Sequence, residues 1–157
     1  MIFTPEHTEK VLAGTKTQTR RLQQPGDEAV RDKDGRIVAV TRLDKNGRRR
    51  LLYHVDFSYA ACPGRGKRGM GRFTITAIRD QCIQDITEED ARAEGVEPAA
   101  DHRGYPSGRA AWVNSHRAGF VLVWNKINGR NPAHRFEAKP RVWVLTIEVE
   151  ATACDSV

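Results

Sequence analysis

A short segment near the start of the chain, GTKTQTRR over residues 14–21, holds the densest group of chemically active side chains. The spacing G-x-K-x-x-T-x-R is met by Gly14, Lys16, Thr19 and Arg21. A threonine hydroxyl becomes a nucleophile when a neighbouring base takes its proton, and a lysine can be that base where burial or nearby cations favour its neutral form. Arg20 and Arg21 supply such cations. The segment could therefore carry nucleophilic catalysis.

The spacing of Lys16 and Thr19 sets a geometric condition on that hypothesis. Side chains alternate along a regular strand, so residues three positions apart face opposite ways. The two can converge only if Lys16 still belongs to the turn after Gly14. The same residues also suit ligand binding, with Lys16 and Arg21 on a phosphate and Thr19 on a base or sugar. A solvated strand surface is the third interpretation of the pattern.

A second chemical candidate, Glu94, ends a predicted short helix. The segment DITEEDARAEG carries a capping box from Thr87 to Asp90 and a terminating Gly95, which predicts a helix over residues 88–94. The helix dipole opposes a negative charge at this end by roughly 0.3–1 kcal/mol and so favours the protonated acid. Glu94 could therefore donate a proton, or it could be a surface glutamate that the helix end tolerates.

A basic, glycine-rich loop is predicted over residues 63–72, PGRGKRGMGR. Its basic side chains are Arg65, Lys67, Arg68 and Arg72. They could follow a phosphate backbone, because the glycines let main-chain N–H groups approach closely. The alternative is a flexible surface loop, although the nearby RRR at 48–50 adds charge. Tyr59 and Tyr105 are candidates for stacking on an unpaired base, whereas the three tryptophans fall on core-facing patterns.

Charge is distributed unevenly along the chain. The 26 lysines and arginines outnumber the 20 aspartates and glutamates, giving a net charge of +6. Residues 1–80 carry 17 basic and 9 acidic side chains, a net of +8, whereas residues 81–157 carry 9 and 11, a net of −2. This asymmetry favours an anionic partner, and nucleic acid is the usual one. A net charge of this size also serves solubility alone.

Capping and turn signals predict the elements that must position these residues. In the first half they are a helix over 5–13, a strand over 15–22, a flexible loop near 23–35, and strands over 36–43 and 48–55 after the turns Asp34-Gly35 and Asn46-Gly47. In the second half they are a strand over 73–80, the helix over 88–94, a loop over 98–109, a long helix ending at Gly129, and a half-exposed final strand over 141–152. The long helix is expected to carry a core-facing stripe of Trp112, His116, Phe120, Val123 and Ile127.

About six short strands and three helices without strict βαβ alternation imply an α+β fold around a mostly antiparallel, closed sheet. The length of 157 residues predicts one domain. No apolar run is long enough to span a membrane, and the N-terminus lacks a signal segment, so we expect a cytoplasmic protein. The spacing of three cysteines and five histidines predicts no disulfide and no metal site, and we expect no cofactor. The cysteines are expected to be buried, inert thiols.

The motif over residues 14–21 resembles the signature of the ASCH family, a PUA-like group, and especially its small phage and prophage members. The similarity extends through YAACPGRGKRGMGRFTITAIR, DITEEDARAEGV, Trp124 and the closing RVWVLTIEVE, and so covers most of the chain. It implies one PUA-like domain over residues 1–157, a mostly antiparallel β-barrel with about three flanking helices. Its cleft would bind RNA, single-stranded nucleic acid or a modified nucleoside, with Gly14, Arg20, Arg21, Tyr59 and the four basic residues of the loop as candidate contacts.

One branch of the family implies an alternative function, that of a small amidohydrolase. Members of this branch remove an acyl group from the exocyclic amine of cytidine. The resemblance assigns Lys16 as proton acceptor, Thr19 as nucleophile and Glu94 as proton donor. The chain departs from that branch through the inserted hairpins between Leu22 and Tyr59. It also has Asp56 and Cys62 where close phage relatives are expected to have Gly and Gln.

Overall fold

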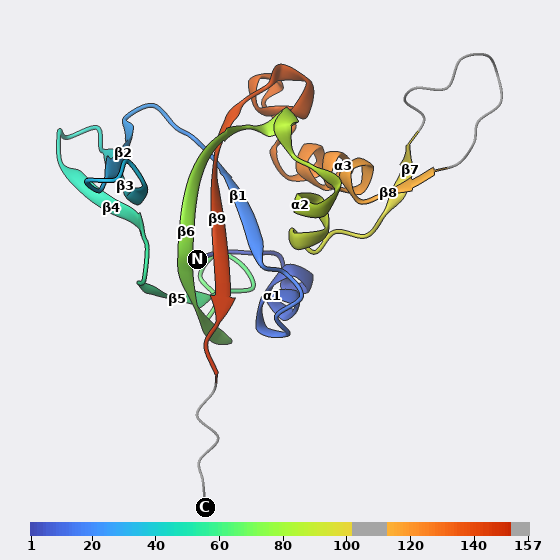
Figure 1. Cartoon of the computed structure of the whole chain (residues 1–157), viewed down its shortest axis with the longest axis horizontal. Coiled ribbons are helices and arrows are strands. Elements are labelled where there is room, and N and C mark those ends of the chain that lie inside the picture. Colours follow the sequence, from blue (N-terminus) through green and yellow to red (C-terminus); the bar gives the residue numbers. More distant parts are fainter. Residues whose placement is uncertain (102–112, 152–157) are drawn as a thin grey trace, which may run out of the picture.

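The computed structural model describes residues 1–101 and 113–151 (Figure 1). The helices are α1 (Pro5–Leu12), α2 (Glu88–Ala93) and α3 (His116–Asn128). The strands are β1 (Gln18–Leu22), β2 (Asp27–Arg31), β3 (Ile37–Leu43), β4 (Arg49–His54), β5 (Ser58–Ala61), β6 (Gly71–Cys82), β7 (Ala99–Asp101), β8 (Val113–Ser115) and β9 (Arg141–Val149). Within the described residues the fold is therefore α+β, as the sequence predicts.

One antiparallel sheet organises the molecule. Its strand order is β1-β9-β6-β3-β2, while β4 pairs with β3 and β5 pairs with β6. β7 and β8 form a separate two-stranded ribbon, which replaces part of the loop expected over 98–109. In the described part of the chain, β1 pairs only with β9 and forms an edge of the sheet. The predicted closure into a barrel is not confirmed.

The turn after helix α1 delays the start of strand β1. The Thr4 hydroxyl caps the helix by accepting from the His7 N–H at 3.2 Å, and Gly14 ends the helical segment with φ +73°. The N–H groups of residues 15 and 16 then both donate to the Lys10 carbonyl at 3.0 Å. The strand consequently begins at Gln18 and not at residue 15. Lys16 lies in the turn, which meets the geometric condition for its convergence with Thr19.

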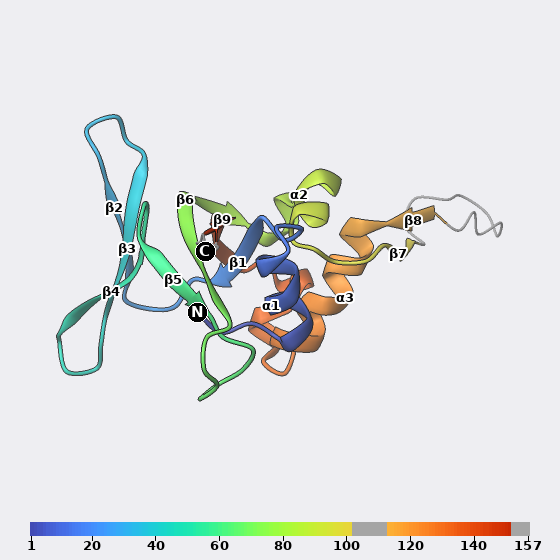
Figure 2. The same ribbon diagram turned by 90° about the horizontal axis from the view of Figure 1, so that it is seen from below.

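The predicted loop near 23–35 contains a strand, β2, and this corrects the sequence-based expectation. β2, β3 and β4 form a three-stranded arm, residues 27–54, on the side of the sheet away from α2 and α3 (Figure 2). Its two turns are at the predicted Gly35 and Gly47, both with positive φ. The arm is anchored at Asp27, whose carboxylate accepts from the Arg42 guanidinium and from the Trp143 indole N–H.

Two hydrophobic clusters lie on opposite faces of β9. One contains Trp143 and Leu145 together with Phe3 and Phe73, and the other contains Val142 and Val144 under helix α3. The first half of β9 is therefore buried on both faces, which corrects the prediction of a half-exposed strand. Trp124 is buried and donates to the His134 carbonyl at 2.8 Å, so its predicted packing role is confirmed.

Two features of helix α3 differ from the predicted stripe. The helix begins at His116 after a Ser115 cap, and Ile127, placed on the core-facing stripe, is 55% exposed. Cys62 and Cys82 are free and partly exposed, although burial was expected. The predictions for Tyr105, Trp112 and Cys154 lie outside the described residues.

We expect Asp27→Asn to lower the free energy of unfolding by about 1–3 kcal/mol at neutral pH, because it leaves the Arg42 guanidinium without its carboxylate. Burial raises the pKa of Asp27, but hydrogen bonds from Arg42, the Gln24 N–H and Trp143 outweigh it and hold that pKa below its usual value. Since the pKa in the folded state lies below that in the unfolded state, the stabilisation is complete above about pH 4 and is lost as the pH falls further. Urea unfolding of both proteins at several pH values measures this. Equal stability at neutral pH would contradict the anchoring role.

Candidate functional site

A cavity of about 450 Å³ lies between strand β1 and helices α1 and α3. Six of the residues predicted from the sequence line it: Lys16, Thr19, Arg20, Arg21, Arg65 and Glu94. Its apolar wall includes Phe3, Val96, Phe120 and Trp124. The fold thus gathers catalytic candidates and binding candidates from both halves of the chain around one space.

Lys16 and Glu94 form a buried ion pair beside this cavity. The Nζ of Lys16 lies 2.6 Å from Oε2 of Glu94 and donates to the Glu94 main-chain carbonyl at 2.7 Å. The two side chains are 2% and 5% exposed. The end of α2 brings Glu94 here, because Gly95 adopts φ +75° and allows the chain to turn against Lys16. The Thr87 cap predicted at the start of this helix is confirmed by the bond from the Asp90 N–H to the Thr87 hydroxyl, whereas the Asp90 carboxylate pairs with Arg20.

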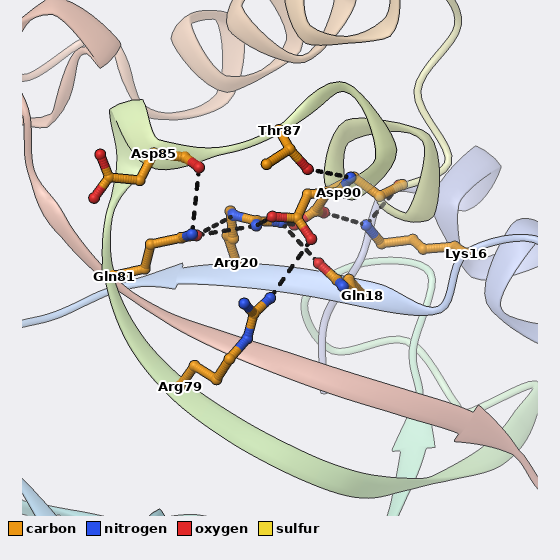
Figure 3. A network of polar contacts seen from close by, with 9 residues as sticks. Lys16, Gln18, Arg20, Arg79, Gln81, Asp85, Thr87 and Asp90 are labelled. Carbon is orange, nitrogen blue, oxygen red and sulfur yellow. Dashed lines mark hydrogen bonds and ion pairs between the residues drawn. The ribbon is translucent and has the colours of Figure 1, made fainter.

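Arg20 joins this pair to a wider polar network (Figure 3). Its guanidinium lies 2.9 Å from Oε1 of Glu94 and 3.0 Å from Oδ2 of Asp90, and it donates to Oε1 of Gln81 from two nitrogens. The Arg20 side chain is 0% exposed. Two carboxylates therefore compensate its charge, and Arg79, 3.5 Å from Asp90, extends the network toward the surface.

Burial and neighbouring charges lower the pKa values of two bases at the site, Lys16 and His7. Burial lowers the pKa of Lys16 below its ordinary value, and Arg21 and Arg20 act in the same direction, although the Glu94 carboxylate opposes them. Burial also lowers the pKa of His7, and the Lys16 cation adds to this effect. The Glu94 carboxylate has two cationic groups beside it, Lys16 on one oxygen and Arg20 on the other.

Thr19 and Arg21 present groups that the protein leaves available. Thr19 is 4% exposed and lines the cavity, and its hydroxyl makes no hydrogen bond to another described residue. Arg21 donates to the Ile2 carbonyl at 2.8 Å and lies over the Phe3 ring, 5.0 Å from its centroid. The Nε of Arg21 is buried without a partner, and no carboxylate of the described residues lies within 4 Å of its guanidinium.

The structure does not bring every predicted site residue to the cavity. Arg65 reaches it from the basic loop, whereas Lys67 and Arg68 are exposed on that loop and do not line it. Arg72 donates to the Ser58 hydroxyl at 2.6 Å, outside the cavity. The Tyr59 ring stacks on Phe73 and its hydroxyl accepts from the His54 N–H at 2.8 Å. Gly14 shapes the turn that places Lys16 and is not itself a lining residue.

Sequence reasoning missed three residues of the site. His7 lines the cavity, one helical turn before the buried Val11, and this spacing on one helix face could have indicated it. Asp90 precedes Glu94 by four residues, so both carboxylates lie on one side of α2, where Arg20 bridges them. For Gln81 the sequence contains no comparable local signal.

No group of three or more His, Cys, Asp or Glu side chains between residues 1 and 101 or 113 and 151 is placed to hold a metal ion. No helix of these two ranges is long and apolar enough to cross a membrane.

Comparisons with known proteins give one structural relative. No protein-family model matches the chain, and no curated protein matches it significantly. Its fold is similar to the crystal structure of protein EF3133 from Enterococcus faecalis V583, of the family DUF984, with a TM-score of 0.50. The two chains share 13% sequence identity, and the match covers 92% of this chain and 69% of that chain. At this identity the likeness concerns the fold, and the function must be argued from the cavity.

Proposed function

We propose that this chain is an ASCH-type, PUA-like domain that binds RNA, single-stranded nucleic acid or a nucleoside in the cavity beside β1. The observation that carries the proposal is the combination of an apolar wall with Arg21 and Arg65, two cations without a carboxylate partner among the described residues. An apolar wall suits the face of a base, and a free guanidinium suits a phosphate. A volume of about 450 Å³ is within the range of small-molecule sites.

The structure also refines which cations would contact phosphate. Lys16 and Arg20 are already neutralised by Glu94 and Asp90, so little of their charge remains for a ligand. Arg21 and Arg65 are not, and they come from different segments that meet at the cavity. The phosphate contact expected at Lys16 and Arg21 is therefore proposed at Arg21 and Arg65.

We expect Arg21→Met to weaken the binding of a nucleoside 5′-monophosphate by about 10- to 100-fold, since it removes a hydrogen-bonded charge pair worth about 1.5–3 kcal/mol. Calorimetric titration with the four ribonucleoside 5′-monophosphates measures this. Arg79→Met is the control, because Arg79 is 49% exposed and pairs with Asp90 away from the cavity. Binding by Arg21→Met as tight as by the unaltered protein would overturn the assignment, as would the absence of nucleotide and RNA binding altogether.

The basic loop should add a contact that depends on salt. Replacing Arg65, Lys67 and Arg68 with alanine is expected to flatten the dependence of log affinity for single-stranded RNA on log salt by about three units at most, because each neutralised phosphate releases counterions. Fluorescence anisotropy at several salt concentrations gives the slope. The control is the same triple change at Arg48, Arg49 and Arg50 on the arm. An unchanged slope in the loop variant would show that the loop does not contact the backbone.

A second candidate function, hydrolysis of acylated cytidine, is favoured by a specific observation. Lys16, Thr19 and Glu94 line the same cavity, and Lys16 occupies the turn from which it can converge with Thr19. In this reaction the Thr19 hydroxyl would attack the acyl carbonyl and Lys16 would take its proton. The carbon–nitrogen bond would then break as Glu94 protonates the leaving amine, and water would release the acid from Thr19. The proton that Lys16 takes from Thr19 would pass to Glu94 across their 2.6 Å contact, and from Glu94 to the leaving amine.

Screening the purified chain against acylated cytidines, beside a panel of short RNAs, separates the two functions. Release of carboxylic acid supports the hydrolase. RNA binding without acid release supports the binding domain, and a chain that does neither contradicts both proposals.

A further inference from the structure

Strand β1 carries main-chain hydrogen-bonding groups that face away from β9, its partner strand in the described part of the chain. The Ile147 N–H donates to the Thr17 carbonyl at 2.9 Å, and the Gln23 N–H donates to the Arg141 carbonyl at 3.1 Å. In an antiparallel ladder, hydrogen-bonded positions alternate with positions whose N–H and C=O point the other way. The main-chain groups of Thr19 and Arg21 thus share the orientation of the Thr17 carbonyl and the Gln23 N–H and point toward β9. Arg20 and Leu22, between them, point their main-chain groups outward.

The cavity reaches the edge of β1 at Arg20. Arg20 and Leu22 both line it, together with Thr19 and Arg21, although the side chains of neighbouring strand residues point to opposite faces of the sheet. Since β1 is an edge strand in the described structure, we infer that the cavity extends around that edge. Arg20 as a whole is 5% exposed while its side chain is 0% exposed, so the remaining exposure belongs to its main chain.

These groups have no partner in the described structure. Three residues before Arg20, just ahead of the strand, the Thr17 N–H donates to the Ala93 carbonyl at 2.8 Å, so the end of α2 covers the start of β1. For residues 1–101 and 113–151, no main-chain or side-chain group bonds to the N–H or C=O of Arg20. Main-chain N–H and C=O groups are strong hydrogen-bonding groups, and a ligand in the cavity can supply the partners that the described residues do not.

We propose that the main-chain N–H and C=O of Arg20 pair with the hydrogen-bonding edge of a nucleobase in the cavity. This inference rests on the proposed nucleotide-binding function and adds the group that reads the base. One extended residue presents a donor and an acceptor side by side. The edge of a base likewise presents an acceptor next to a donor, as cytosine does with its ring nitrogen and exocyclic amine. Two hydrogen bonds would form, and the base face would lie against the apolar wall.

A peptide strand could also pair with an open edge, but the surroundings favour a base. Strand addition needs an exposed edge several residues long. Here the Thr17–Ala93 bond closes the edge at one end, and the cavity is bounded by α1 and α3. Arg21, next in the chain, places a cation where the phosphate of a bound nucleotide could lie.

Amide hydrogen exchange of the full-length, isotope-labelled chain tests this inference. Without ligand, the Arg20 amide should exchange about 100-fold faster than the Thr19 and Arg21 amides, which bond to β9. Saturating cytidine 5′-monophosphate should slow Arg20 by about tenfold or more and leave Arg21 unchanged. A matched ligand, the same nucleotide with two methyl groups on its exocyclic amine, lacks the donor hydrogen. It should bind about tenfold more weakly, the loss of roughly one hydrogen bond to a buried carbonyl.

The outcomes separate this inference from the function on which it rests. If the nucleotide shifts the resonances of Arg21 and Arg65 but leaves Arg20 exchange unchanged, base reading by the strand edge is overturned while nucleotide binding stands. If neither nucleotide nor short RNA shifts any resonance of the cavity, both are overturned. Protection of Arg20 before any ligand is added would show that the edge is not open, and protection by an extended peptide alone would identify a different ligand.

Discussion

Replacing Glu94 with glutamine is expected to lower the free energy of unfolding by about 3–5 kcal/mol, the cost of removing one partner from a buried ion pair. The Glu94 carboxylate contacts Lys16 through one oxygen and Arg20 through the other, and its side chain is 5% exposed. A neutral amide keeps the shape but presents a donor to one of two cations that can only donate. Urea unfolding at neutral pH measures the loss.

Two companion variants make this result specific. Glu97→Gln removes an exposed carboxylate 3.0 Å from Lys10, and it should cost no more than about 1 kcal/mol. Lys16→Met combined with Glu94→Gln removes both members of the pair, and it should be more stable than Glu94→Gln alone, because one uncompensated cation has gone. If Glu94→Gln is as mild as Glu97→Gln, the ion pair does not hold the site together.

The second large effect concerns turnover of an acylated cytidine. Thr19→Val keeps the shape of the side chain and removes the hydroxyl, so we expect turnover to fall by about a hundredfold or more. Binding of the product nucleoside should change little. Lys16→Met should also abolish hydrolysis, since no base then remains for the hydroxyl proton. Thr19 is a cleaner test than Glu94, because Glu94 also stabilises the fold.

The matched control for this experiment is Thr17→Val. Thr17 is exposed, lies two positions earlier and does not line the cavity, so its loss should leave turnover unchanged. The hydrolase proposal fails if the unaltered chain releases no acid from any acylated cytidine. It also fails if Thr19→Val reacts as fast as the unaltered chain.

Capping residues and turn residues predict those elements whose ends are determined by hydrogen bonds to neighbouring residues in the sequence. The α2 helix is an example, because its Thr87 cap and Gly95 terminator act on neighbouring main-chain groups. The turns at Gly35 and Gly47 are further examples. Strand β2 is not predicted, because the contacts that make it a strand are with residues outside its own segment. Its charged, polar sequence after Pro25 indicates a loop, and only pairing with β3 and the anchoring of Asp27 make it a strand.

The candidate site shows the same division between local and distant causes. Side-chain alternation predicts that Lys16 must lie in a turn if it is to meet Thr19, and the structure places it there. The resemblance names Glu94, but neither argument predicts that its carboxylate is shared with Arg20. That contact joins positions 74 residues apart and depends on how α2 lies against β1. No periodicity or spacing in the sequence predicts a contact between residues that are so far apart along the chain.

The arm formed by β2, β3 and β4 also offers a place to attach a reporter. Its turns lie away from α2 and α3 (Figure 2), and apart from the adjacent residues no atom lies within 4 Å of the position that a Cβ would take at Gly35 or Gly47. A fluorescent dye on Asn46→Cys, in a chain whose Cys62, Cys82 and Cys154 have been replaced, would therefore leave the cavity free. Because β2 and β4 are hydrogen-bonded to β3, the dye would rotate together with the whole molecule. Binding of a long RNA would then be visible as slower rotation, without a label on the nucleic acid.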